Sequence, residues 1–419
     1  MVDGFKERAG GGLTGDDGGA AFAALEGEGA RVESKPGKGD CAGVAVEAVL
    51  FEKANGLVGR RGEKPGGEAD GNCEEKSGKH ADTILSQPKW SKLWRMRLLL
   101  LLVLVFAHSA SGELLVLHKG HSSLGFYTDQ GTWIASAPVR AHPHEMVFST
   151  DGRYAYTTDN GTMRIEQAGT GGNTVSIIDL KERRTVGEIS LGEFRRPHGI
   201  DIIRATGQLL VSTELPDRLL LLDPVKRQVV RTWATEGKTA HMVVATPDGR
   251  YAFISNSTTA NVSAIDLQTG KVKLIPTGAR PEGSVVSKDG KRVYVCNRDA
   301  AHISVIDTAT LAVTQTIKTS PGPVRIAITP DQRTVVYGLL DERGVEWADT
   351  RTGQVAGRVD LPAALGQIVS LHLSHDGQTA YAANENMDTV YAVSLAGKKI
   401  LHSFKTAKGY SPDPVVPKP

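Results

Sequence analysis

Hydrophobic and polar residues alternate in short segments from residue 113 to the C-terminus, and turn residues separate these segments. One stretch reads SVVSK, KRVYVCN, HISVIDT and AVTQTIKT, with breaks at Asp289-Gly290, Arg298-Asp299 and Ala309-Thr310. A period of two residues with many β-branched side chains predicts β-strands. Asp-Gly predicts a tight hairpin turn, because both residues tolerate positive φ. Each such stretch is therefore expected to form four antiparallel strands.

The turn of the first hairpin recurs as STDGRYAY, TPDGRYAF, SKDGKRVY, TPDQRTVV and SHDGQTAY, and the last four copies lie 41 to 45 residues apart. In one further unit the same turn reads ATGQLLV. A second marker, such as SIIDL or SVIDT, follows the turns. Repeats of this length with several strands each are typical of β-propeller blades.

The number of repeats predicts the number of blades. Six complete units begin near residues 142, 196, 239, 281, 323 and 368. Before them, ELLVLHK, SLGFYTD and TWIASAPV supply three strands of a unit without an innermost strand. The C-terminal SPDPVVP aligns with the unit starts HPHEMVF and RPHGIDI, so we expect it to complete that unit and leave no open edge. The predicted fold is all-β: a seven-bladed β-propeller of four-stranded blades over residues 113–419, closed by a C-terminal strand.

One strand carries a family signature. Tyr294-Val295-Cys296-Asn297 differs by one residue from YVTN, and it lies between the Asp-Gly turn and the SVIDT marker. Residues 113–419 therefore resemble the YVTN-family β-propellers, which are related to propeller lactonases and to haem d1-type propellers. The resemblance implies the fold. It implies function only broadly, because such propellers serve as binding modules, scaffolds and enzymes.

Residues 1–95 differ in composition from the rest of the chain. Stretches such as AGGGLTGDDGG cannot bury enough apolar surface to offset their ordering entropy, so we expect a disordered tail that lies upstream of the true start, Met96. Residues 96–112, MRLLLLLVLVFAHSASG, have the basic start, apolar run and small residues of a secretory signal peptide. The alternative is a buried internal strand or helix. A signal peptide predicts a periplasmic or secreted protein.

Composition excludes several classes of protein. The formal net charge is +2 and no run of five basic residues occurs, so nothing indicates a nucleic-acid partner. The apolar run from Leu98 to Ala107 is too short for a transmembrane anchor, which needs about 20 residues. No CxxC or CxxCH motif occurs, so we expect neither a zinc ribbon nor a c-type haem. We expect a monomer whose partner is a small molecule or a protein at the mouth of the central channel.

One aligned position would start the innermost strand of every blade, at the channel mouth. It lies seven residues before the turn aspartate, except in the unit without that aspartate, where the Pro-His pair sets the alignment. In chain order it holds His144, His198, His241, Glu282, Val324 and Val369, with Asp413 in the closing segment. The connections between second and third strands would share this face, as would the arginines before the prolines of RPHG and RPEG. The candidate ligand-binding residues are His142, His144, Arg196, His198, Glu214, His241, Arg280, Glu282, Asn297 and Glu385.

Two interpretations of these residues remain open. In the first, the histidines at this aligned position, which we call the rim position, only hydrogen-bond to neighbouring blades and line a water-filled channel. Alternatively, His144, His198, His241 and Glu282 can bind a divalent metal, and the arginines can hold an anion. The second blade also carries an insertion, residues 159–173, in which Met163, Arg164 and Glu166 would belong to a lid over the mouth.

The leading functional hypothesis is an exported ligand-binding or interaction scaffold that uses this rim. The alternative is a lactonase-type hydrolase or a metal-dependent enzyme that uses the rim His, Glu and Arg residues.

Deleting residues 1–112 is expected to leave the folded protein intact, because this segment has no core-forming pattern. Thermal unfolding of the full chain and of the truncated protein would check this. A large drop in the melting temperature of the truncated protein would contradict it.

Overall fold

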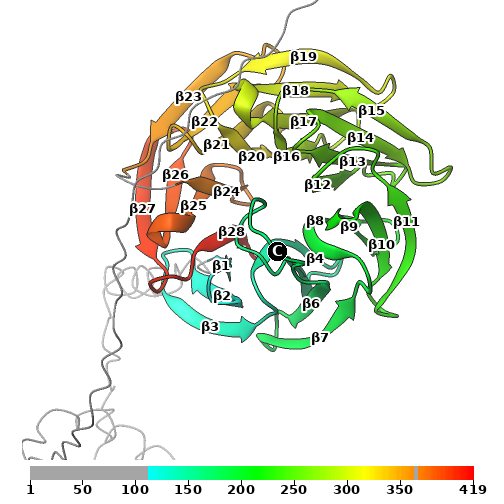
Figure 1. Ribbon diagram of the computed structural model, residues 1–419. Helices are drawn as coiled ribbons and strands as arrows, with labels where there is room; N and C mark the ends of the chain where they lie inside the picture. The colour runs from blue at the N-terminus through cyan, green and yellow to red at the C-terminus, as the bar shows by residue number, and fades with distance from the viewer. Residues whose placement is uncertain (1–111, 363–366) are drawn as a thin grey trace, which may run out of the picture. The chain divides into compact units, whose positions relative to one another are not determined.

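The computed structural model describes residues 112–362 and 367–419, and these residues form seven four-stranded antiparallel sheets with two short 3-10 helices. The predicted disordered tail, 1–95, and the predicted signal peptide, apart from Gly112, lie outside the described residues. Figure 1 shows the sheets arranged in a ring as the blades of a propeller. The seven-bladed fold predicted from the repeats is therefore confirmed. In the described part of the chain, no helix is long and apolar enough to cross a membrane.

Within each blade, four strands follow one another from the channel outward. Blades 1 to 3 consist of β28 (Pro412–Pro417), β1 (Glu113–His118), β2 (Ser123–Thr128) and β3 (Trp133–Pro138); β4 (Pro143–Phe148), β5 (Tyr154–Asp159), β6 (Thr174–Asp179) and β7 (Arg184–Ser190); and β8 (Arg195–Ile203), β9 (Gln208–Leu215), β10 (Asp217–Asp223) and β11 (Gln228–Ala234). Blades 4 and 5 consist of β12 (Ala240–Ala245), β13 (Tyr251–Asn256), β14 (Asn261–Asp266) and β15 (Val272–Pro276); and β16 (Pro281–Val286), β17 (Arg292–Asn297), β18 (His302–Asp307) and β19 (Ala312–Lys318). Blades 6 and 7 consist of β20 (Pro323–Ile328), β21 (Thr334–Leu339), β22 (Gly344–Asp349) and β23 (Val355–Asp360); and β24 (Ile368–Leu373), β25 (Thr379–Asn384), β26 (Thr389–Ser394) and β27 (Lys399–Lys405). The 3-10 helices η1 (Arg298–Ala300) and η2 (Glu385–Met387) follow β17 and β25.

The Asp-Gly turns form at the predicted places, with positive φ at the glycine and not at the aspartate. In blade 2, Gly152 has a φ of 68°, and the Asp151 carboxylate accepts hydrogen bonds from the Ser149 hydroxyl at 2.6 Å and from the Arg153 amide at 3.1 Å. The same arrangement recurs at Asp289, which accepts from Ser287 at 2.6 Å. The glycine avoids the steric cost that positive φ imposes on other residues.

The hydrophobic core lies between the blades. Alternate residues of one strand face opposite neighbours: Leu209 and Val211 pack toward blade 2, whereas Leu210 packs toward blade 4. Seven buried apolar clusters of this kind lie at the seven blade junctions of the described residues. Each blade is thus buried on both faces, so the middle strands are buried along almost their whole length, polar residues included.

The C-terminal strand closes the ring. β28 pairs antiparallel with β1, so that Val415 lies opposite Val116 and Val416 opposite Leu115. The red and cyan ends of the chain meet at this pair in Figure 1. The closure by a C-terminal strand that the sequence predicts is confirmed.

Deleting residues 410–419 is expected to lower the free energy of unfolding by several kcal/mol. The deletion removes the buried Val415 and Val416 and exposes the edge of β1. The midpoint of urea denaturation would measure the effect, and deletion of the exposed Pro419 alone is the control. An unchanged midpoint in the longer deletion would contradict the role of β28.

Candidate functional site

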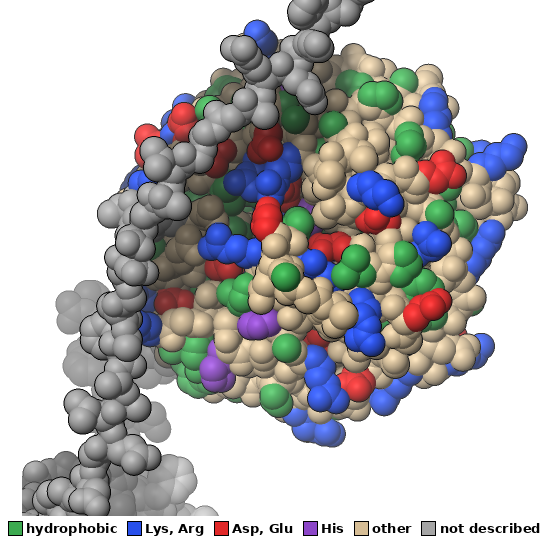
Figure 2. All heavy atoms as spheres, viewed as in Figure 1, with side chains coloured by type: hydrophobic (Ala, Val, Ile, Leu, Met, Phe, Trp, Pro, Cys, Tyr) green, Lys and Arg blue, Asp and Glu red, His purple; other side chains and the backbone are tan. Residues whose placement is uncertain are grey.

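A cavity of about 420 Å³ occupies the mouth of the central channel. Every inner strand contributes to it, because the aligned rim position places one side chain of each blade there. These side chains are His144, His198, His241, Glu282, Val324, Val369 and Asp413. Figure 2 shows Lys, Arg, Asp and Glu side chains gathered around a hollow near the middle of this face.

The chain enters six of the seven inner strands through a residue with left-handed backbone geometry. His142, Arg196 and Arg280 have φ values of 46°, 54° and 54°, and each precedes a proline near the strand start. This position explains why Arg196 and Arg280 lie beside the rim residues of their own blades. His142 occupies the same position but does not line the cavity, and its Nδ1 lies 3.0 Å from the Lys119 carbonyl oxygen.

Three histidines and two carboxylates form a buried chain along one side of the cavity. His144 Nε2 lies 2.8 Å from the carbonyl oxygen of Thr162, and His144 Nδ1 lies 3.4 Å from His198 Nε2. His198 Nδ1 lies 3.1 Å from Glu214 Oε1. The His198 and His241 ring centroids are 3.7 Å apart, and His241 Nε2 lies 2.7 Å from Glu282 Oε2.

Burial sets the protonation states of this chain. Burial, together with nearby positive charge, holds the pKa of His144 and of His198 well below its ordinary value, so both imidazoles are neutral near pH 7. Burial would raise the pKa of Glu282, but His241 and the guanidinium groups of Arg325 and Arg280 outweigh it and lower the pKa to about 2. Burial raises the pKa of Glu214 to about 6, although His241 and Arg196 oppose the shift.

The insertion of blade 2 is fixed across the rim by two arginines. Arg196 donates hydrogen bonds to the carbonyl oxygens of Arg164 at 3.2 Å and of Ile165 at 2.7 Å, and its Nε pairs with Glu214 Oε2 at 2.9 Å. Arg280 pairs with Glu166 of the insertion at 2.8 Å and with Glu282 at 3.0 Å. Met163, Arg164 and Glu166 therefore line the cavity, as expected for a lid, and the donors of Arg196 and Arg280 are largely engaged in holding it.

An ion pair crosses the channel. Arg325 of β20 in blade 6 lines the cavity, and its Nη2 lies 2.6 Å from Glu145 Oε1 of β4 in blade 2. Burial raises the pKa of Glu145 and the charge of Arg325 opposes the rise. Both residues lie one position after the rim position, where blades 3 and 5 have Gly199 and Gly283.

Sequence reasoning missed Arg325 and Lys119 as cavity residues. Lys119, in the connection after β1, lies 3.4 Å from Asp413 and 3.9 Å from Glu385. The position after the rim position carries Glu145 and Arg325 as its only charged residues, and this contrast was available in the repeat alignment. No repeat signal marks Lys119, because its connection has no counterpart of the same composition in the other blades.

The remaining candidate residues from the sequence differ in whether they line the cavity. Glu385 of η2 lines the cavity. Asn297 is buried outside it, where its Oδ1 accepts from the Gly278 amide at 3.1 Å and its Nδ2 donates to Ser304 at 2.9 Å. Of the four residues predicted to bind a metal, His198 and His241 fall in a group with Glu214 whose ligand atoms lie within 4.8 Å of one another, and His144 and Glu282 lie next to it.

Comparison with known proteins agrees with the repeat analysis. Residues 232–332 match the model of the YNCE-like beta-propeller family, which is consistent with the resemblance of the repeats to YVTN-type propellers. No curated protein sequence matches the chain significantly.

Three solved structures share the architecture. A functionally unknown protein from Desulfotomaculum acetoxidans is similar with a TM-score of 0.62 and 15% identity, over 73% of this chain and 99% of that one. The dihydro-heme d1 dehydrogenase NirN in complex with DHE has a TM-score of 0.55 and 17% identity, over 73% and 75% of the two chains. Hydrazine synthase from Kuenenia stuttgartiensis has a TM-score of 0.55 and 18% identity, over 71% and 93%. At these identities the likeness shows the fold alone.

Replacing Asp159, where the insertion begins, by asparagine is expected to make the protein less sensitive to rising pH. Burial raises the pKa of Asp159 to about 7, although hydroxyls of Thr174 and Ser176 donate to it. A carboxyl with a raised folded-state pKa favours folding at low pH, and this contribution is lost as pH rises from about 4 to about 7. The wild type should therefore lose stability relative to Asp159→Asn by up to about 1.4 kcal/mol per pH unit in that window.

Urea denaturation of both proteins between pH 4 and pH 8 would measure this difference. Asp299→Asn, at an exposed aspartate on η1, is the matched control and should follow the wild type. Parallel curves for the wild type and Asp159→Asn would show that Asp159 ionises without cost in the folded protein.

Proposed function

We propose that the protein is an exported ligand-binding propeller that holds a small organic anion in the channel-mouth cavity without forming a covalent bond. The observation that carries this proposal is a pair of guanidinium groups, those of Arg164 and Arg298, which line the cavity and have no carboxylate closer than 3.8 Å among the described residues. Export rests on the signal-like sequence of residues 96–112.

Among the cations that line the cavity, only these two arginines lack a close ion-pair partner in the described structure. Its other cations are occupied: Lys119 faces Asp413 and Glu385, Arg280 holds Glu282 and Glu166, and Arg325 holds Glu145. Arg298 lies 3.8 Å from Asp341 and 4.0 Å from Asp299, and its buried Nε has no hydrogen-bond partner within the described structure. Arg164 forms no ion pair with a described residue.

The two arginines approach the cavity from different elements. Arg164 belongs to the insertion of blade 2, whereas Arg298 begins η1 in blade 5. A guanidinium presents parallel N–H donors that match a carboxylate or a phosphate, so two of them suit a ligand that carries one or two such groups. The neutral faces of His144 and His198 would border the less polar part of the ligand.

The size of the cavity agrees with a small molecule. Its volume, about 420 Å³, falls in the range of roughly 300–1,000 Å³ that is usual for small-molecule sites. The structural neighbour NirN is described in complex with DHE, so a propeller of this shape is compatible with a ligand. The proposal for this chain depends on its own arginines, since the neighbour shares only the fold.

Hydrolysis of a bound ester or lactone is the second candidate function. Burial raises the pKa of Glu214 to about 6, and Glu214 contacts His198 at 3.1 Å, which is the composition of a general acid–base pair. Glu214 itself does not line the cavity, so His198 would have to face the reacting water. Turnover of a lactone panel by the wild type, lost in Glu214→Gln, would favour this second function over simple binding.

Replacing both arginines in the double variant Arg164→Gln, Arg298→Gln is expected to weaken anion binding by at least about tenfold per arginine, because each charge-assisted hydrogen bond contributes about 1.5–3 kcal/mol. Calorimetric titration of the full chain with inorganic phosphate, succinate, citrate and a sugar phosphate would measure it. Arg333→Gln, at an exposed arginine on the Asp-Gly turn face, is the matched control and should bind as the wild type does. Equal affinity of the double variant and the wild type for every anion would overturn the proposal.

A further inference from the structure

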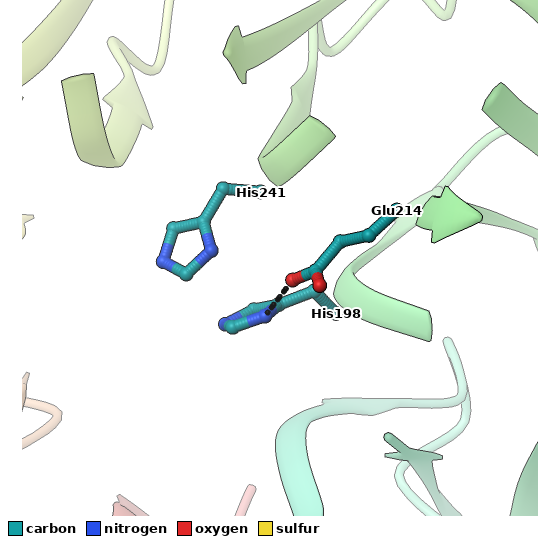
Figure 3. A group of neighbouring side chains, drawn as sticks. All are labelled: His198, Glu214 and His241. Atoms are coloured by element: carbon teal, nitrogen blue, oxygen red, sulfur yellow. Dashed lines mark hydrogen bonds and ion pairs between the residues drawn. The ribbon is translucent and has the colours of Figure 1, made fainter. Parts of the chain in front are cut away.

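Three potential metal-ligand atoms converge beside the cavity, from His198, Glu214 and His241. The three side chains point toward one another in Figure 3, and their ligand atoms all lie within 4.8 Å of one another. His241 Nδ1 is buried and has no hydrogen-bond partner in the described structure, and only 4% of the His241 side chain is exposed. An unpaired buried nitrogen is costly, so its position next to a carboxylate and a second imidazole needs an explanation.

The hydrogen bonds around the histidines determine which nitrogens carry lone pairs. His144 Nε2 faces the Thr162 carbonyl oxygen at 2.8 Å, and since that oxygen can only accept, Nε2 carries the hydrogen. The Nδ1 of neutral His144 can then accept from His198 Nε2, which lies 3.4 Å away. In that tautomer His198 Nδ1, which lies 3.1 Å from Glu214 Oε1, offers a lone pair.

The same reasoning applies to His241. Its Nε2 lies 2.7 Å from the Glu282 carboxylate and donates to it, so Nδ1, which has no partner in the described structure, is the nitrogen of this ring that is free to coordinate an ion. Two imidazole nitrogens and a carboxylate oxygen thus lie around a common point. A proton can satisfy only two of these three atoms, whereas a metal cation can accept a lone pair from each of them.

We propose that His198 Nδ1, His241 Nδ1 and a carboxylate oxygen of Glu214 form a binding site for a divalent first-row transition metal ion. Two imidazole nitrogens and one carboxylate oxygen are a ligand set that zinc and iron sites use, with the remaining coordination positions open. In a zinc site with bonds of about 2.0–2.1 Å, the ligand atoms lie about 3.4 Å apart. His198 and Glu214 already have this spacing, so His241 needs to approach by little more than about 1 Å.

The surroundings of the three ligands support the assignment. Metal-binding histidines usually donate their second N–H to a carboxylate, a carbonyl or another polar group, which fixes the ring. Glu282 holds His241 in this way, and His144 holds His198 while being held by the Thr162 carbonyl oxygen. The second oxygen of Glu214 pairs with Arg196 at 2.9 Å, which fixes the carboxylate. His144 and Glu282 are therefore positioning residues.

The site goes beyond the proposed anion binding, because the metal would bind while the cavity is empty. His198 and His241 line the cavity, so the open coordination positions would face the space that a ligand fills. Arg164 and Arg298 are not among the three ligands or their hydrogen-bond partners. Substitutions at the two sets of residues can therefore be tested separately.

The experiment is a calorimetric titration of the chelator-treated full chain with ZnCl₂, and a titration with CoCl₂ followed by visible absorption, which reports the coordination of the ion directly. We expect one equivalent of either metal to bind, and no comparable binding of Mg²⁺ or Ca²⁺, which prefer oxygen ligands. Loss of a residue that only hydrogen-bonds to a metal ligand typically weakens metal binding roughly 10- to 100-fold. Glu214→Gln, which keeps the shape of the side chain, and His241→Ala remove a ligand itself, so each should weaken binding by more than this.

His142→Asn is the matched control, since His142 lies on the same rim but outside the cavity, and asparagine tolerates its positive φ. Glu282→Gln should weaken binding about 10- to 100-fold and leave the stoichiometry at one. The double variant Arg164→Gln, Arg298→Gln should bind cobalt as the wild type does, so loss of anion binding and loss of metal binding are distinguishable. Circular dichroism would confirm that each variant is folded.

Two outcomes would overturn the proposal. One is the absence of stoichiometric zinc or cobalt binding to the wild type, which would mean that a shared proton separates the three acceptors. The other is unchanged affinity in both Glu214→Gln and His241→Ala, which would place the bound ion elsewhere.

Discussion

The pairing of β28 with β1 is the constraint on which the rest of the structure depends. Every blade buries apolar side chains on both faces, so each needs a neighbour on either side, and blade 7 can find its second neighbour only if the ring closes. Closure joins residues about three hundred positions apart in sequence. It also completes the channel mouth, because it places Asp413 beside Lys119 and supplies the seventh rim position.

Closure has an electrostatic consequence at the channel mouth. Side chains from seven inner strands converge there, and among them are carboxylates and cations with little exposure to water. Buried charges are tolerated only when they are paired, and most of these are: Arg325 with Glu145, Arg280 with Glu282, and Lys119 with Asp413. The guanidinium groups of Arg164 and Arg298, which have at most long ion pairs, and the unpaired Nδ1 of His241 are the groups through which we propose that the protein binds its ligands.

The fold by itself does not assign a function. Structures that share it at 15–18% identity include a protein described as functionally unknown, a dehydrogenase and a synthase. The propeller supplies a rigid ring of strand ends, and the chemistry depends on which side chains occupy them. In this chain the strand ends carry three histidines on consecutive blades, and Arg196 and Arg280 hold the insertion beside them.

The sequence by itself determined the repeat, and the repeat determined the fold. Alternation of apolar residues, Asp-Gly turns such as Asp289-Gly290 and the alignment of SPDPVVP with the other unit starts were sufficient to predict seven blades and the closing strand, because these signals are local and recur. The same alignment identified the rim position that carries His144, His198, His241 and Glu282, since equivalent positions of a repeat occupy equivalent places in the ring.

Only the tertiary structure decided how these residues divide their contacts. The sequence grouped Glu282 with the histidines as a metal ligand, whereas the structure places Glu214 beside His198 and His241 and engages Glu282 with His241 and Arg280. The ion pair of Arg325 with Glu145 joins blades on opposite sides of the channel, and Arg196 binds the insertion of the preceding blade. Repeat spacing fixes where each backbone position lies around the ring, but the partner of a long side chain depends on distances across the channel, which exist only after the ring has closed.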